Sequence, residues 1–137
     1  MYLIGFPLLV IPFAIYNMIA FLTPGLAWTA NVLTIHLISG QDWTVTPEDI
    51  LLAFSILLLC VEVIKASRMG VRGLMDHVLS LILFIVMLVE FLLVGRAGSS
   101  TFFILMVISL VDVMAGFIIT ARTAQRDIQI ERDVSPI

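Results

Sequence analysis

Four long runs of apolar residues constrain the fold of this chain more than any other feature. The runs cover about residues 3–22, 47–67, 74–94 and 101–121. A helix needs about 20 predominantly apolar residues to cross the ~30 Å hydrocarbon core of a bilayer. Hydrophobic residues make up 61% of the chain and charged residues 12%, which leaves too little polar surface for a water-soluble domain. The sequence therefore predicts an all-α membrane protein, a four-transmembrane-helix bundle in which residues 1–137 form one polytopic domain.

The first apolar run contains Pro7 and Pro12 and no charged residue. Because proline inside a helix removes a backbone hydrogen bond, we expect Pro12 to bend this helix. A cleaved signal peptide is the alternative interpretation, since Gly25-Leu26-Ala27 offers small residues for cleavage. The absence of a basic N-terminal region and the length of the apolar run favour a membrane span.

The second run reaches its full length through a helix start signal. Thr46 suits the N-cap position, Pro47 the first helical position, and Asp49 the third position of a capping box. A helix from Pro47 to about Ser67 rises about 31 Å, which matches the ~30 Å core of a bilayer.

The basic residues are distributed unevenly between the two sides of a four-span chain. Arg96 falls on one side. The other six of the seven fall on the opposite side: Lys65, Arg68, Arg72, Arg122, Arg126 and Arg132. Because cytoplasmic loops are enriched in lysine and arginine, we expect a multi-pass protein of the plasma (inner) membrane with both termini cytoplasmic. The loop 23–46 then lies outside, and the cytoplasmic tail 122–137 begins as an extension of the fourth helix and then frays.

Residues 32–46 have the pattern of a β-hairpin. Residues 32–37 are rich in β-branched and aliphatic side chains, residues 39–42 favour a turn, and residues 43–46 are again strand-like. An isolated hairpin is marginally stable in water, so it needs support from the bundle, the membrane surface or a neighbouring subunit. The alternative is an interfacial helix over residues 26–37 with Trp28 at the membrane surface.

Small or polar residues recur at helical spacing in the predicted spans, which identifies the faces that pack inward. Asn17 is the main polar residue of the first span, and Ser55 and Glu62 share one face of the second. The stripes of the third and fourth spans are longer: Asp76, Ser80, Leu83, Met87 and Glu90, and Ser109, Asp112, Gly116, Thr120 and Thr123.

Polar residues near the predicted cytoplasmic ends have structural explanations. Glu62 precedes Lys65 by three residues, which favours a local ion pair. Asp76 and His77 open the third span, where a carboxylate stabilises the positive end of the helix dipole. The predicted cytoplasmic interface comprises Glu62, Lys65, Arg68, Arg72, Asp76 and His77.

Two acidic residues lie deeper and are the main candidates for a functional site. Glu90 has a depth comparable to that of Asn17, so we expect a hydrogen bond between them, and Arg96 is a second candidate partner. Asp112 lies near the middle of the fourth span, where an uncompensated charge costs about 2.5–3.5 kcal/mol on insertion scales.

Ser55 and Ser109 are candidate hydrogen-bond partners of Asp112. One interpretation makes the intramembrane polar residues interhelical hydrogen-bonding groups, and the other makes them stations on a proton or cation path. The structural interpretation is favoured, because acids at two depths do not by themselves make a pathway. The residues concerned are Asp112, Glu90, Asn17, Ser55 and Ser109.

The chain lacks the residue sets of common enzymes and of nucleic-acid-binding proteins. It contains no HExxH, GxSxG, CxxC or phosphate-binding glycine motif, and its basic residues are scattered. Cys60 lies in an apolar run and is expected to pack as a small hydrophobic residue. His36 is a lone loop histidine with no expected metal role. We therefore expect no enzymatic activity, no metal, no cofactor and no nucleic-acid partner.

These features favour an accessory or scaffolding subunit in a homo- or hetero-oligomeric membrane complex. The part outside the membrane is small, and the polar stripes lack a catalytic set. The alternative is a small oligomeric proton or cation channel or transporter that uses Asp112 and Glu90. A third role, contact with anionic lipid headgroups through Lys65, Arg68 and Arg72, rests on few charges. The expected partners are the lipid bilayer and other subunits, identical or not.

Overall fold

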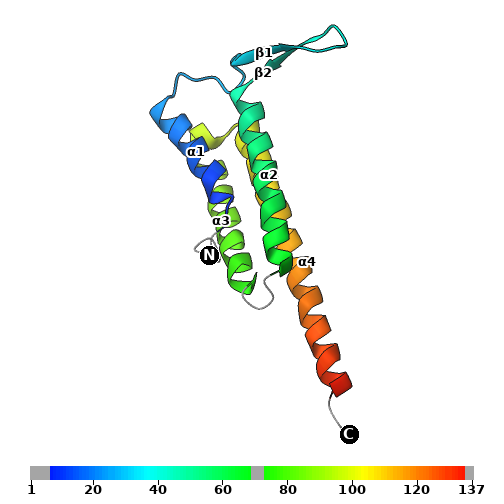
Figure 1. The fold of residues 1–137 in the computed structure, drawn as a ribbon. Helices are drawn as coiled ribbons and strands as arrows, with labels where there is room; N and C mark the ends of the chain where they lie inside the picture. Colours follow the sequence, from blue (N-terminus) through cyan, green and yellow to red (C-terminus); the bar gives the residue numbers. More distant parts are fainter. Residues whose placement is uncertain (1–6, 69–72, 135–137) are drawn as a thin grey trace.

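The computed structural model describes residues 7–68 and 73–134, and the chain is mostly helical with one small sheet (Figure 1). Its helices and strands follow in this order: α1 (Val10–Leu22), β1 (Leu33–His36), β2 (Asp42–Val45), α2 (Pro47–Arg68), α3 (Gly73–Leu93), the short 3-10 helix η2 (Gly95–Ala97) and α4 (Ser100–Val134).

Three helices of the described part are long and apolar enough to cross a membrane. The candidate spans are Pro47–Ser67, Met75–Leu93 and Ser100–Arg132. Most of their large apolar side chains are exposed, as expected for helices whose outer surfaces contact lipid. These helices agree with the second, third and fourth predicted spans.

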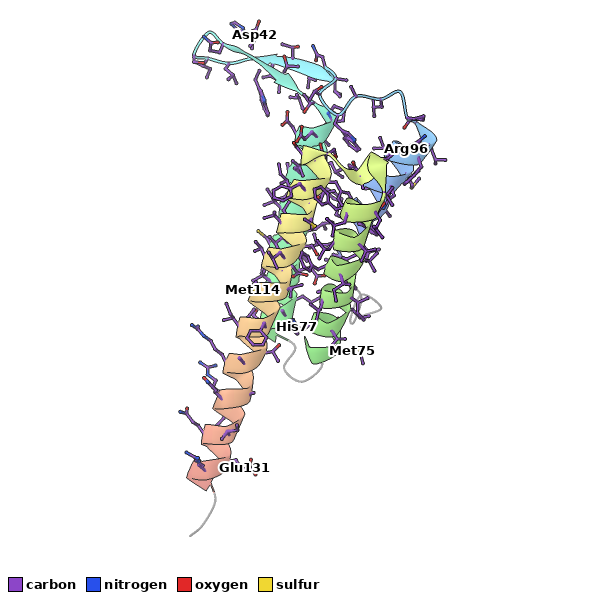
Figure 2. The ribbon with its side chains drawn as sticks, turned by 180° about the vertical axis from the view of Figure 1, so that it is seen from behind. Asp42, Met75, His77, Arg96, Met114 and Glu131 are labelled. Atoms are coloured by element: carbon purple, nitrogen blue, oxygen red, sulfur yellow. The ribbon has the colours of Figure 1, made fainter. Side chains whose placement is uncertain are left out.

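The long helix α4 organises the packing. Both α2 and α3 lie along it, and they contact each other less than they contact α4 (Figures 1 and 2). We call the end that carries the β-strands the hairpin end and the opposite end the tail end. With 35 residues, α4 rises about 52 Å and projects beyond the other helices at the tail end (Figure 1). The tail that was expected to fray continues as helix to Val134.

Helix α1 is shorter than the predicted first span. Its 13 residues rise about 20 Å, less than the ~30 Å of a hydrocarbon core. Pro12 lies in its first turn, where backbone N–H groups have no intrahelical partner, so the hydrogen-bond loss expected from this proline does not occur. The beginning of the predicted span, residues 3–6, lies outside the described residues.

The predicted β-hairpin is confirmed. Strands β1 and β2 are antiparallel, with the pairs Leu33↔Val45, Thr34↔Thr44, Ile35↔Trp43 and His36↔Asp42. Gly40 has φ of 90°, which glycine adopts without steric cost in the connecting turn. The alternative interfacial helix over residues 26–37 is wrong, because β1 occupies the end of that range.

The predicted capping box joins the hairpin directly to α2. The Thr46 N–H donates to Asp49 Oδ2 at 3.0 Å, and the Asp49 N–H donates to Thr46 Oγ1 at 3.2 Å. Helix α2 begins at Pro47, as the sequence signal predicts. Only Thr46 separates β2 from α2, so the hairpin lies at the beginning of this helix.

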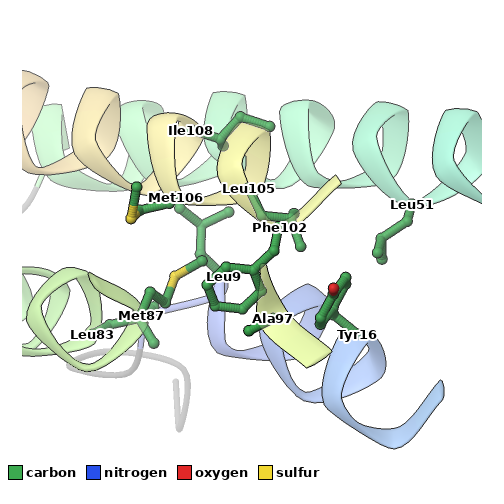
Figure 3. Close-up of a cluster of buried hydrophobic side chains, with 10 residues drawn as sticks. All are labelled: Leu9, Tyr16, Leu51, Leu83, Met87, Ala97, Phe102, Leu105, Met106 and Ile108. Carbon is green, nitrogen blue, oxygen red and sulfur yellow. The ribbon is translucent and has the colours of Figure 1, made fainter. Parts of the chain in front are cut away.

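The apolar core lies at the hairpin half, where α1 packs against α2, η2 and α4 (Figure 3). Tyr16 is fully buried there, and its hydroxyl donates to the Arg96 carbonyl at 3.0 Å and lies 2.7 Å from Ser99 Oγ. Its ring stacks on Trp28 at 4.8 Å and meets the edge of Phe102 at 5.0 Å. This aromatic and hydrogen-bonded contact ties α1 to the turn before α4.

Arg96 also stabilises α1. Its Nη1 donates to the Ala20 carbonyl at 3.1 Å, and its guanidinium lies 5.5 Å from the centre of the Phe21 ring. A cation is favourable at the C-terminal end of a helix because the dipole is negative there. The expected contact of Arg96 with Glu90 is therefore replaced by contacts with α1.

Candidate functional site: a polar cluster between the long helices

Polar side chains from three helices meet in the tail half of the protein. We call this set the polar cluster. It comprises Glu62 and Lys65 from α2, Asp76, His77 and Ser80 from α3, and Asp112 from α4. Helical spacing explains the gathering, since Asp76 and Ser80 are one turn apart and share a face of α3. Figure 2 shows His77 on α3 beside α4.

Glu62 connects α2 to the beginning of α1. It is 3% exposed, and its Oε1 accepts hydrogen bonds from the Leu8 N–H at 2.7 Å and from Lys65 Nζ at 3.2 Å. Leu8 precedes α1, where backbone N–H groups lack an intrahelical acceptor. The carboxylate satisfies one such donor and also forms the ion pair with Lys65 that the sequence predicts.

Lys65 links α2 to α3. Its Nζ lies 3.2 Å from Glu62 Oε1 and 3.5 Å from Asp76 Oδ2, and its side chain is 15% exposed. Asp76 was expected mainly to stabilise the dipole of its own helix, whereas the structure places its buried carboxylate against this ammonium group. Removing one partner of a buried ion pair is strongly destabilising, because the other charge is then left uncompensated.

Among the described residues, Glu62 and Asp76 form ion pairs with Lys65, whereas Asp112 forms none. It is 6% exposed, Ser80 acts as a hydrogen-bond partner, and Oδ2 has no hydrogen-bond partner among the described residues. The two candidate partners do not serve it. Ser55 donates to the Leu51 carbonyl of its own helix at 2.7 Å, and the buried Ser109 Oγ has no hydrogen-bond partner in the described part of the chain.

A small cavity lies inside the cluster. The volume open to the centre of a water molecule is about 20 Å³. One water molecule needs roughly 10–15 Å³ of such volume. Three of its lining side chains present buried polar atoms without a hydrogen bond in the described structure: Asp76 Oδ1 and Oδ2, His77 Nδ1 and Asp112 Oδ2. The cavity therefore has the size and the polar lining to hold water.

Gly116 allows α3 and α4 to approach closely at this level. A Cβ atom at position 116 would lie 2.9 Å from His77 Nδ1, closer than real Cβ contacts. Small residues at such positions let helix backbones pack tightly in membranes. The sequence identifies Gly116 as part of the inward stripe, but not the residue that packs against it.

Glu90 belongs to a separate site at the hairpin half. Asn17 Nδ2 donates to Glu90 Oε2 at 3.4 Å and to the Phe13 carbonyl at 3.1 Å, so the expected contact is present. About 21 Å of helix separates Glu90 from Asp76 on α3. The buried apolar side chains of Leu83 and Met87 lie between these two residues along the same stripe.

The remaining candidate residues lie away from the polar cluster or outside the residues that the structure describes. Arg72 and the side chain of Arg68 lie outside the described residues. Cys60 is exposed on α2 rather than packed in the core. His36 pairs with Asp42 across the hairpin at 2.6 Å, and both side chains are exposed.

Sequence reasoning missed two contributors to this arrangement. The Leu8 N–H has no signature in the sequence, because every residue except proline carries a backbone N–H. Tyr16 appears in the sequence as one apolar position among many, and only its partners in the fold reveal its role.

Comparison with known protein families, with curated proteins and with solved structures finds no match to this chain.

Proposed function

We propose that this protein is an accessory or scaffolding subunit of a homo- or hetero-oligomeric membrane complex. The proposal rests mainly on the hairpin, whose apolar face is largely exposed in the described part of the chain. The contacts of the polar cluster join helices of the same chain, which favours a structural role for these polar residues.

The strand register divides the hairpin into two faces. Side chains of directly paired residues point to the same side, and successive residues alternate. One face is apolar and the other is polar: Leu33, Ile35, Trp43 and Val45 against Thr34, His36, Asp42 and Thr44. On the apolar face, the exposed fractions are 55% for Leu33, 38% for Ile35 and 48% for Trp43.

The position of the hairpin supports a contact with a neighbour. It extends sideways from the end of α2, beyond the outline of the helices (Figures 1 and 2). A subunit standing beside α2 would lie beneath or against it. Because an isolated two-stranded hairpin is marginally stable in water, burial of its apolar face by such a neighbour would stabilise it.

We also propose the four-span topology with both termini cytoplasmic, in the plasma (inner) membrane. Helix α1, together with the preceding apolar residues, would form the first span. The uneven distribution of basic residues supports this orientation, including Arg122, Arg126 and Arg132 on the projecting part of α4.

A proton or cation channel is the second candidate function. The observation that favours it is the group of buried carboxyl groups around a water-sized cavity. The observation that disfavours it is the apolar core between this cavity and the hairpin end, which includes Leu9, Met87 and Phe102 (Figure 3). In the described part of a single chain, the polar residues do not continue through that core.

Native mass spectrometry after extraction with an amphipathic polymer tests the proposal. We expect a simple multiple of the 15.2 kDa chain or a fixed ratio with other subunits. Trp43→Thr should reduce the fraction of the complex at least several-fold. Thr44→Ser is the matched control, since it alters the neighbouring residue on the polar face and should leave the complex intact. A single chain of 15.2 kDa in the unaltered protein would overturn the proposal.

A further inference from the structure

The charges of the polar cluster do not balance. Three carboxyl groups, Glu62, Asp76 and Asp112, are buried with the one ammonium group of Lys65. If all were ionised and His77 were neutral, the cluster would carry two excess negative charges. Burial of uncompensated charge away from water is costly, and a buried acid commonly relieves that cost by becoming neutral.

Asp112 is the carboxyl group that most needs neutralising. Glu62 has two hydrogen-bond donors, and Asp76 has the Lys65 ammonium group at 3.5 Å. Asp112 is only 6% exposed and lines the cavity, and its Oδ2 has no hydrogen-bond partner among the described residues. A protonated Oδ2 would supply a donor where the cavity offers acceptors.

We propose that the cavity is a proton-binding site, in which Asp112 carries an exchangeable proton and a water molecule connects it to Asp76 and His77. The proton arrives from hydronium at the tail end, where Asp112 carboxylate plus hydronium gives the carboxylic acid and one water. The new O–H donates to the cavity water, which in turn donates to Asp76 or to His77 Nδ1. Both acceptors have buried atoms without a hydrogen bond in the described structure.

The groups facing Asp112 support proton binding over binding of a metal ion. They are Glu62 and Lys65 on α2 and Asp76, His77 and Ser80 on α3. No set of three or more histidine, cysteine or acidic side chains in the described part has the geometry to hold a metal ion. The site is also distinct from a conduit, since the apolar core closes it toward the hairpin end, so the proton enters and leaves at the tail end. Proton binding at Asp112 goes beyond the proposed scaffolding role, and it does not depend on that role.

Infrared spectroscopy of the full chain in phosphatidylcholine vesicles tests the site without requiring a reagent to reach it. The C=O stretching band of a protonated carboxylic acid should be present at neutral pH, shift in D2O and disappear on alkalinisation. Asp112→Asn should abolish the band. Absence of the band from the unaltered protein, or its persistence in Asp112→Asn, would overturn the proposal.

Asp76→Asn is a second test, because Asp76 lines the same cavity and is 4% exposed. This variant should retain the band, and the band should disappear at a lower pH, since one neighbouring negative charge is gone. A purely structural role for Asp76 would leave that pH unchanged. Loss of the band when sodium chloride replaces choline chloride would identify a cation site instead and refute the proton site. Circular dichroism checks that both variants keep their helices. The pH titration of the band in the unaltered protein tests the proposal even if neither variant folds.

Discussion

The carboxylate of Glu62 accepts a hydrogen bond from the backbone N–H of Leu8 at 2.7 Å, across 54 residues of sequence. A buried negative charge thus meets the N-terminal end of α1, where free N–H groups and the helix dipole both favour an anion. The same oxygen pairs with Lys65, so the position of α1 is coupled to the charges that join α2 and α3.

Replacement of Glu62 should therefore have a large effect on stability. Glu62→Ala leaves the Leu8 donor unpaired and removes one partner of Lys65, which should lower the free energy of unfolding by about 3–5 kcal/mol. Glu62→Gln keeps an acceptor for Leu8 and should cost less. Reversible unfolding in mixed micelles measures both, and equal losses for the two variants would show that the Leu8 contact contributes nothing.

The features that the sequence predicted correctly are local ones. The capping box of Thr46 and Asp49 lies within four residues, and the hairpin follows from the alternation and turn residues of one short segment. The three long helices follow from continuous apolar runs. Each of these signals is complete within the segment that it describes, so no knowledge of the neighbouring helices is needed.

The features that the sequence did not predict depend on how the helices lie beside one another. Periodicity places Asp76 and Asp112 on inward faces, but it does not show that Lys65 reaches Asp76 across the α2–α3 connection. Ser55 was one of two candidate partners of Asp112, whereas its hydroxyl donates to a carbonyl of its own helix, as serine in an apolar helix commonly does. The short α1 was also missed, because apolar composition alone does not set where a helix begins.

The close contact between Gly116 and His77 predicts a coupled effect of substitution. Gly116→Ala places a Cβ atom 2.9 Å from His77 Nδ1, so the helices or the ring must shift. Such overpacking typically costs about 1–3 kcal/mol. In a double-mutant cycle, His77→Ala should recover most of this loss. An additive cycle would mean that the two residues do not meet.

Two variants of Tyr16 distinguish the stability that its hydroxyl provides by hydrogen bonding from the stability that its ring provides by packing. Tyr16→Phe keeps the ring but removes the bond to the Arg96 carbonyl and the contact with Ser99, at about 0.5–1.5 kcal/mol for each hydrogen bond. Tyr16→Ala also removes the stacking on Trp28 and leaves a cavity, at about 3–5 kcal/mol. Thermal unfolding should rank the variants in that order, and equal midpoints for Tyr16→Phe and the unaltered protein would show that the hydroxyl contributes no stability.

The capping box predicts a local effect at the start of α2. Thr46→Ala removes the acceptor of the Asp49 N–H and should cost about 1 kcal/mol, whereas Thr46→Ser keeps it. Amide hydrogen exchange should rise about fivefold or more in the first turn of α2 in Thr46→Ala only, since each 1.4 kcal/mol is tenfold. Thr44→Ala, two residues earlier in β2, controls for general loosening of the hairpin. Unchanged exchange in Thr46→Ala would show that the first turn of α2 does not depend on this cap.

The proposed orientation can be tested with single cysteines in a Cys60→Ser background. A membrane-impermeant maleimide should label Ser39→Cys in the hairpin turn from outside intact cells. It should label Gln129→Cys, on the projecting part of α4, only after the membrane is permeabilised. The expectation follows from the excess of arginine and lysine on the tail side, which opposes translocation of that side. Labelling of Gln129→Cys alone from outside would reverse the orientation, and labelling of both positions from outside would require an even number of spans between them.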